Sequence, residues 1–185
     1  MHTIILASAS PRRREILDLM GVPYIVKPAK TELSPDLILS PEDAVLRVAR
    51  GKAEEIAQDH PDEVVLGADT VVVVDGRILG KPKDREDAKT MLRQLSGREH
   101  RVITAVWLCD GERSEGFADS ASVTFLPMTE EEIDAYVASG EPMGKAGSYA
   151  IQGRGMRHIR GIHGDFYTVM GLPSGRLYET LKKHI

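Results

Sequence analysis

A single acidic residue interrupts the most apolar stretch of the chain. Residues 64–74 read Val-Val-Leu-Gly-Ala-Asp-Thr-Val-Val-Val-Val, with Asp69 inside the run. A short run rich in valine and leucine is typical of a strand that is buried on both faces. An ionised carboxylate in such surroundings is costly to desolvate unless cations, a metal ion or hydrogen-bond donors meet it. Asp69 is therefore the first candidate for chemistry.

Basic residues stand on segments rich in glycine, proline and serine. These segments are Ser8-Ala-Ser-Pro-Arg-Arg-Arg14, Gly51-Lys52 and Gly80-Lys81-Pro82. The first one follows a predicted strand and opens a helix, where unpaired N–H groups, hydroxyls and guanidinium groups suit a phosphate. Successive helical residues diverge by about 100°, so we expect Arg12 and Arg13 to face a ligand and Arg14 to face solvent. One acid with several bases predicts a metal-assisted site for a polyphosphate.

Three further side chains are assigned from their surroundings. Lys81 lies between a glycine and a proline and could place a point charge on a β- or γ-phosphate. Lys52 by itself has the features of a surface lysine. Glu32, in a proline-containing loop, is the best second carboxylate for Mg²⁺, which takes one or two carboxylates plus substrate phosphates.

Two of these features also have ordinary structural explanations. Gly67 and Asp69 could form a turn in which the carboxylate accepts hydrogen bonds from nearby backbone N–H groups. The arginine segment could be a capped helix with a charged first turn, although positive charge there opposes the helix dipole by about 0.3–1 kcal/mol per residue. The sequence leaves both alternatives open.

Composition limits the class of protein. The chain has 185 residues, of which 42% are hydrophobic and 28% charged, which fits one globular domain over residues 1–185. A net charge of −4 argues against a nucleic-acid-binding module built on the arginine cluster, and against binding to anionic lipid. The single cysteine, Cys109, excludes an internal disulfide and fits a reducing compartment. The apolar residues 3–9 are too few to span a membrane and precede the arginines, so we expect a cytoplasmic protein.

The spacing of hydrophobic residues, together with the positions of glycine, proline and capping residues, predicts alternating strands and helices. The expected fold is therefore α/β, with a mixed central sheet and flanking helices. A glycine-rich segment, residues 139–176, is predicted to be an irregular wall of the site. Strands are predicted at 3–7 and 23–26, as a valine-rich pair around Asp69, and at 78–79, 102–108 and 121–126. Helices are predicted at 11–20, from Ser40-Pro41, from Asp84 to Gly97, from Thr129 to 138 and at 175–183.

Several short strings occur together and in order along nearly the whole chain. They are Leu6-Ala-Ser-Ala-Ser-Pro-Arg-Arg13, Gly67-Ala-Asp-Thr70, Gly80-Lys-Pro82, Leu95-Ser-Gly97, Lys145-Ala-Gly147, Ile151-Gln-Gly153 and Gly171-Leu-Pro173. Together they resemble the Maf family of nucleoside triphosphate pyrophosphatases. The resemblance implies two lobes around a nucleotide cleft, similar to the inosine triphosphate pyrophosphatases. It also implies hydrolysis between the α- and β-phosphates, which gives a nucleoside monophosphate and pyrophosphate and keeps nucleotide pools clean.

The same resemblance implies a role for each candidate residue. Asp69 would be the proton acceptor or a ligand of the divalent cation, Mg²⁺ or Mn²⁺, which Glu32 would help to hold. The triphosphate would meet Ser8, Arg13, Lys52 and Lys81, and base choice would depend on Arg12, Thr70 and Gln152.

Two strings indicate the branch of the family. Lys145-Ala-Gly147 with Ile151-Gln-Gly153 resembles the branch that acts on dTTP and UTP, modified pyrimidine nucleotides included. The 7-methyl-GTP branch usually carries a glutamate where Gln152 stands, and a neutral amide suits a uracil or thymine edge. The chain departs from the branch at Gly144, which replaces the usual acid, and at Ser174, which replaces an apolar residue.

Two rival functions remain. The chain could be a nucleotide-binding regulator of cell division without turnover, or the nucleic-acid-binding module that its charge disfavours. Motifs for covalent catalysis by serine or cysteine are missing from the sequence. For a small cytosolic enzyme a homodimer is the default expectation.

Overall fold

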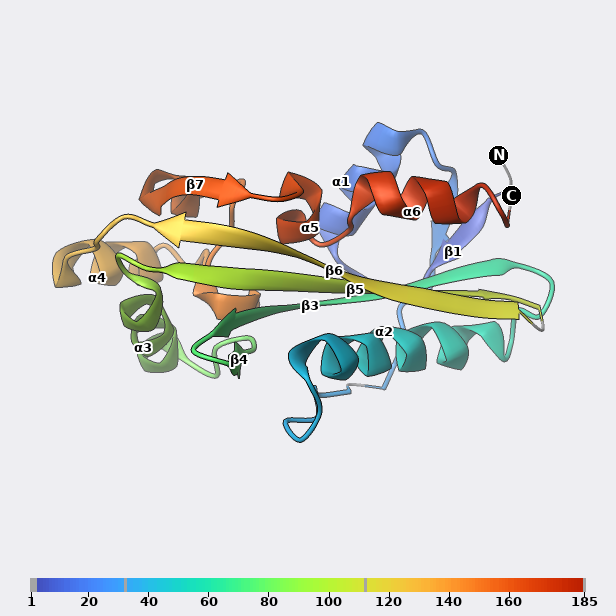
Figure 1. Cartoon of the computed structure of the whole chain (residues 1–185), viewed down its shortest axis with the longest axis horizontal. Coiled ribbons are helices and arrows are strands. Elements are labelled where there is room, and N and C mark those ends of the chain that lie inside the picture. Colours follow the sequence, from blue (N-terminus) through green and yellow to red (C-terminus); the bar gives the residue numbers. More distant parts are fainter. Residues whose placement is uncertain (1–2, 32, 112, 185) are drawn as a thin grey trace. The chain divides into compact units, whose positions relative to one another are not determined.

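The computed structural model describes residues 3–31, 33–111 and 113–184 (Figure 1). Its sheet contains seven strands in the order β2-β1-β3-β5-β6-β7, with β4 paired to β3. Strand β1 pairs in parallel with β2 and β3, whereas the β3–β4 and β6–β7 pairs are antiparallel. The predicted fold class, a mixed sheet with flanking helices, is therefore confirmed.

The strands are β1 (Ile4–Leu6), β2 (Tyr24–Val26), β3 (Val64–Val74), β4 (Arg77–Leu79), β5 (Glu99–Asp110), β6 (Arg113–Phe125) and β7 (Ile159–His163). The helices are α1 (Pro11–Met20), α2 (Pro41–Ala57), α3 (Arg85–Leu95), α4 (Glu130–Ala138), α5 (Phe166–Met170) and α6 (Ser174–Leu181), with the 3₁₀ turns η1 (Ala146–Ser148) and η2 (Arg154–His158). None of the helices among the described residues is both long and apolar enough to cross a membrane.

The chain divides into two compact units. The first unit contains Met1–Thr70, Thr104–Asp119 and Gly171–Ile185, and the second contains Val71–Ile103 and Ser120–Met170. The long strands β3, β5 and β6 each supply residues to both units.

In the first unit, sequence signals set the ends of the helices. Helix α1 ends at Gly21, whose φ of 67° is a left-handed conformation that suits glycine. At the start of α1 the prediction is only half right, because Ser10 makes no capping bond with its side chain. At α2 the Ser40 hydroxyl does accept from the N–H of Asp43, at 3.1 Å.

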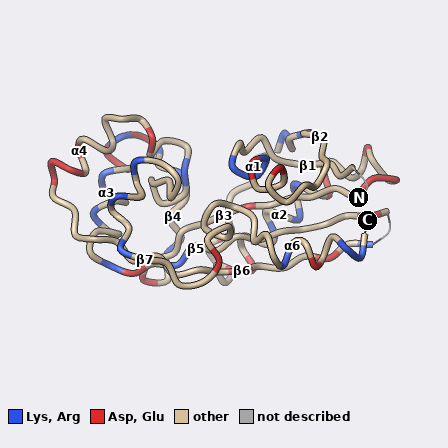
Figure 2. Tube along the Cα trace, turned by 90° about the horizontal axis from the view of Figure 1, so that it is seen from above, with Lys and Arg blue, Asp and Glu red and all other residues tan. Residues whose placement is uncertain are grey.

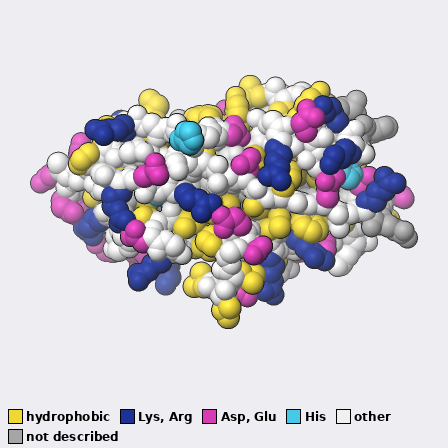
Figure 3. Space-filling view, in the orientation of Figure 1, with side chains coloured by type: hydrophobic (Ala, Val, Ile, Leu, Met, Phe, Trp, Pro, Cys, Tyr) yellow, Lys and Arg dark blue, Asp and Glu magenta, His cyan; other side chains and the backbone are white. Residues whose placement is uncertain are grey.

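The loop before α2 carries exposed apolar side chains. Leu37 is 79% exposed and Ile38 is 93% exposed, and hydrophobic atoms protrude there at the lower edge of Figure 3. The described residues of this loop, 28–31 and 33–40, form no helix or strand, as predicted.

Strand β3 corrects one prediction. The sequence predicts a pair of strands around Asp69, with a turn at Gly67 and Asp69 as an alternative. The structure instead has one continuous strand of 11 residues, with Asp69 and Thr70 as its two half-buried positions. Val65 and Leu66 pair with Ile5 and Leu6 of β1, and this pairing anchors the N-terminal half of the strand.

In the second unit, α3 and α4 pack together with complementary charges. Figure 2 shows basic residues along α3 and acidic residues on α4. Arg93 contacts Glu130 at 2.8 Å, and Lys89 contacts Asp134 at 2.7 Å. The predicted capping box at Thr129 is present in both directions.

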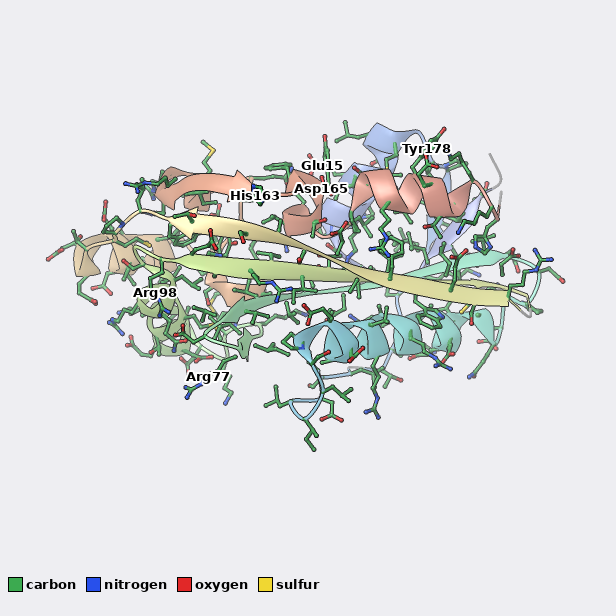
Figure 4. All side chains as sticks on the ribbon, viewed as in Figure 1. Glu15, Arg77, Arg98, His163, Asp165 and Tyr178 are labelled. Atoms are coloured by element: carbon green, nitrogen blue, oxygen red, sulfur yellow. The ribbon has the colours of Figure 1, made fainter. Side chains whose placement is uncertain are left out.

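The segment 139–176 is more ordered than the sequence predicts. It contains both 3₁₀ turns, β7 and α5, which the sequence analysis missed, as well as the start of α6. Asp165 precedes α5 (Figure 4), and its carboxylate accepts from the N–H groups of Tyr167 and Thr168 at 3.1 and 3.0 Å. Ser174 is the first residue of α6, and Pro173 at the N-cap supplies no side-chain cap.

Candidate functional site

Asp69 and Lys52 form a partly buried ion pair in the first unit. Lysine Nζ lies 2.7 Å from carboxylate Oδ1, and the two side chains are 22% and 19% exposed. Such limited contact with water strengthens the attraction between the charges relative to an exposed pair. Lys52 is therefore a partner of the candidate acid, and its surface-lysine interpretation is wrong.

Gly67 brings this pair together. It lies two residues before Asp69 on β3, so both positions face α2. A Cβ built on Gly67 would lie 2.7 Å from the backbone nitrogen of Ala53 and 2.8 Å from its Cβ. Only glycine therefore lets α2 approach the strand this closely, which places Lys52 within reach of Asp69.

Arg13 lies at the centre of a second cluster in the first unit. Its guanidinium donates to Ser8 Oγ at 2.9 Å, to Thr70 Oγ1 at 3.3 Å and to the Gly171 carbonyl at 3.1 Å. Thr70 is in turn 2.9 Å from the Thr104 hydroxyl. Arg13 is only 7% exposed, so the sequence prediction of a helix-start cation is right about its place and misses its burial.

The two clusters use opposite faces of β3. Asp69 and Thr70 are adjacent and therefore point to opposite sides of the strand, toward Lys52 of α2 and Arg13 of α1. Figure 1 shows α1 and α2 on opposite sides of the sheet. Burial lowers the pKa of Arg13 to about 10, while the charge of Asp69 opposes this shift and that of Arg12 adds to it. The clusters are thus separate in hydrogen bonding but coupled through charge.

Lys81 and the Lys145-Ala-Gly147 string are connected within the second unit. Lys81 is exposed, and the carbonyl of Gly80 before it accepts the N–H of Gly147 at 3.0 Å. Gly147 has a φ of 66°, and a Cβ there would lie 2.7 Å from Val72 Cγ2. Glycine is therefore required at this position both for its backbone conformation and for the close contact.

Gln152 lies in the second unit beside an open, mainly apolar hollow. The hollow has a volume of about 580 Å³ and is lined by Ile151, Gln152, Met156, Ile159, Arg160, Gly161, Ile162 and Phe166. An apolar surface with a few polar groups is the usual character of a small-molecule site.

The described residues test the metal prediction only in part. Glu32, the predicted second carboxylate, lies outside the described residues. Across 3–31, 33–111 and 113–184, no group of at least three His, Cys, Asp or Glu side chains could hold a metal ion. A single half-buried carboxylate at Asp69 still fits Mg²⁺, because this ion keeps water and phosphate oxygens among its ligands.

Comparison with known proteins decides the family. The family described as Maf-like protein matches residues 3–184, nearly the whole chain. The chain belongs to the Maf family. A protein of Bacillus velezensis named dTTP/UTP pyrophosphatase is 49% identical over 180 residues, which cover 97% of this Maf chain and 95% of the relative. A protein of Bacillus mycoides with the same name is 49% identical over 183 residues, 99% of this chain and 96% of the relative.

Among solved structures, the likeness to this Maf chain is weaker. The Staphylococcus aureus Ham1 protein superposes with a TM-score of 0.46 at 15% identity, over 67% of this chain and 72% of that one. The two compact units agree with the expected pair of lobes, while the nucleotide cleft stays a prediction.

Sequence reasoning missed several residues that support the Maf motifs. Thr104 is fully buried, and its hydroxyl within the otherwise apolar stretch 102–109 could have marked it as a partner for a polar group. Gly171 contributes a backbone carbonyl, for which its place in the Gly171-Leu-Pro173 string was the only signal. Glu141 binds backbone N–H groups in the second unit, and no spacing rule pointed to it.

Proposed function

We propose that this Maf-family chain hydrolyses nucleoside triphosphates, dTTP and UTP above all, at the bond between the α- and β-phosphates. The products are the nucleoside monophosphate and pyrophosphate, so the enzyme cleans nucleotide pools, modified pyrimidine nucleotides included. The activity named for the two Bacillus relatives supports the substrate. The observation that most directly supports this chemistry is the partly buried ion pair between Asp69 of β3 and Lys52 of α2.

Asp69 orients the attacking water in this proposal and accepts its proton. The water oxygen forms a bond to phosphorus, and the bridging P–O bond breaks, leaving the negative charge on the departing group. Lys52, 2.7 Å from the acid, keeps the carboxylate in one position and adds positive charge beside the phosphates. A divalent cation, Mg²⁺ or Mn²⁺, held by Asp69 with Glu32, would neutralise charge on the phosphate oxygens.

The other candidate residues bind substrate in the proposal. Ser8, Arg13 and Lys81 meet the triphosphate, with Arg13 supplying its charge from within its hydrogen-bonded network. Arg12, Thr70 and Gln152 govern base choice. We propose that residues 1–185 act as one Maf domain, since the family match covers residues 3–184.

We also infer a cytoplasmic homodimer. The single cysteine, Cys109, is buried, and burial raises the pKa of its thiol, which suits a structural role in a reducing compartment.

The direct test is to measure pyrophosphate and nucleoside monophosphate from UTP and dTTP, with ATP and GTP for comparison. We expect pyrophosphate and the monophosphate in equal amounts, and loss of activity when EDTA removes divalent cations. Release of inorganic phosphate with the diphosphate would contradict cleavage at the α–β bond. Tight UTP binding without turnover in the presence of Mg²⁺ or Mn²⁺ would instead favour the regulator.

A further inference from the structure

The segment that carries Gln152 is fixed at its C-terminal side by one carboxylate. Glu141 Oε1 accepts the N–H of Arg154 at 2.9 Å, and Oε2 accepts the N–H of Gly155 at 3.0 Å. Hydrogen bonds to an ionised carboxylate are about twice as strong as bonds between neutral groups. Burial raises the pKa of the Glu141 carboxyl, but hydrogen bonds from Tyr136 and from these two N–H groups outweigh it and leave the pKa below its ordinary value.

The N-terminal side of the same segment is fixed by Tyr136. Its hydroxyl accepts the N–H of Ala150 at 3.1 Å and donates to the Glu141 carboxylate. The Tyr136 side chain is fully buried, and burial together with Glu141 raises the pKa of its hydroxyl. Tyr136 and Glu141 thus form a connected pair that holds the backbone on both sides of Gln152.

Two glycines show how closely the segment fits this pair. A Cβ on Gly153 would overlap the Glu141 carboxylate, with Oε2 only 2.8 Å away. A Cβ on Gly155 would lie 2.6 Å from the Tyr136 hydroxyl and 2.6 Å from the Ala150 carbonyl. Contacts this short leave no room for a side chain, so the segment and the pair are complementary in shape.

The Tyr136–Glu141 pair is itself held in place by α4 and the residues that follow this helix. Tyr136 belongs to α4, whose start is fixed by the capping box at Thr129. Glu141 follows that helix, where its N–H donates to Ser139 Oγ at 3.3 Å and its carbonyl accepts from Lys145 Nζ at 2.6 Å. The C-terminal end of α4 therefore positions the backbone that carries Gln152 beside the apolar hollow.

We propose that Glu141 and Tyr136 are positioning residues for base selection, which act by holding the backbone of 150–155 so that Gln152 reads the pyrimidine edge. This inference rests on the proposed function. An amide that donates to one carbonyl and accepts from one ring N–H discriminates only when it is held in place, because hydrogen bonds weaken steeply with misalignment. A loosened segment loses selectivity, whereas the hydrolytic groups of the first unit are unaffected.

The test separates base recognition from turnover. We would measure kcat and KM for UTP, and the Ki of GTP as an inhibitor of UTP hydrolysis, in Glu141→Ala, Glu141→Gln and Tyr136→Phe. For Glu141→Ala we expect KM for UTP to rise about tenfold, as loss of hydrogen bonds to a charged group implies, with kcat and the Ki of GTP within about twofold of wild type. Glu141→Gln should restore part of the loss, because its amide oxygen still accepts one N–H.

The matched control is Glu130→Gln. Glu130 is an exposed glutamate of the same unit that pairs with Arg93, and its loss leaves the 150–155 backbone untouched. Hydrogen exchange at the Arg154 and Gly155 amides reports whether the variants release the segment, and thermal unfolding reports whether they fold.

The outcomes differ for the inference and for the function on which it rests. A folded Glu141→Ala with faster exchange but an unchanged KM for UTP would overturn the inference alone. A parallel rise in KM and in the Ki of GTP would also overturn it, since that marks general damage. An inactive wild-type enzyme would overturn the proposed function and the inference together.

Discussion

The ion pair of the first unit and the Gln152 segment of the second unit are built in different ways. Asp69 and Lys52 stand on a long strand and a helix, and one side chain fixes the other directly. Gln152 stands on an irregular segment whose backbone is held by side chains from elsewhere. The charged pair is thus positioned by regular secondary structure, whereas Gln152, the residue proposed to select the base, is positioned by an irregular segment that side chains hold in place. Variants of the first region should change rate, and variants of the second should change base preference.

The largest expected effect is on turnover, and it tests the first half of the comparison. Asp69→Asn keeps the shape of the side chain but removes the charge that orients water. We expect kcat for UTP to fall by about a hundredfold to ten-thousandfold, the usual contribution of a general base, with the fold intact. Asp75→Asn is the matched control, because Asp75 follows β3 in a turn with φ of 49°, which asparagine also tolerates. Normal rates in Asp69→Asn would remove this residue from the mechanism.

The next effect concerns the close approach of α2 to β3. Gly67→Ala places a methyl group against backbone atoms of α2, so we expect a loss of about 1–3 kcal/mol in the free energy of unfolding. Activity should fall as well, because α2 carries Lys52. Gly175→Ala is the control in the same unit, since a Cβ there meets nothing within 4 Å. Equal stability of the two variants in urea titrations would mean that α2 can shift without cost.

A third prediction concerns His100, a buried histidine of the second unit. Burial lowers the pKa of His100 from 6.5 to about 4, and its Nε2 is 2.8 Å from the Tyr149 hydroxyl. The unfolded chain therefore binds a proton more readily, so stability is fully present above pH 6.5 and is lost as the pH falls toward 4. From pH 7 to pH 5 we expect a loss of about 2 kcal/mol. The urea midpoint of His100→Gln should be less sensitive over this range, and an equal slope in both proteins would contradict the assignment.

The smallest effect is predicted for the ion pair between α3 and α4. Arg93 and Glu130 are exposed, and such pairs contribute little because water and salt screen them. Their mutual hydrogen bonds raise the pKa of Arg93 and lower that of Glu130, so each charged form is favoured. Glu130→Gln should therefore leave the thermal midpoint and base preference unchanged. A clear fall in either would show that α4 needs this contact to support Tyr136 and Glu141.

Sequence was sufficient where local rules apply. Gly21, Ser40 and the Thr129 capping box marked helix ends that the structure confirms, because caps and left-handed glycines act within a few residues. The hairpin at Asp75-Gly76 was found for the same reason. The rule failed at Ser10, where residue type alone did not reveal that the hydroxyl would not cap.

The candidate site was only partly predictable. The lone acid at Asp69 was visible as a polar residue in an apolar run, but its partner Lys52 was not, because a contact between helix and strand depends on how they pack. Gly67 was attributed to a possible turn, although its function is to admit the helix. Glu141 bears no local signal, since its partners are backbone groups more than ten residues away.

The hydrogen bond between Gly147 and Gly80 limits how the two loops can change in evolution. It joins the Gly80-Lys-Pro82 and Lys145-Ala-Gly147 strings, far apart in the chain, through backbone atoms alone. Backbone atoms are the same in every residue, so amino acids of the two loops other than Gly147 can change only if the lengths and turns of the loops are retained. A chimera that transplants one loop from a relative with a different loop length must transplant both.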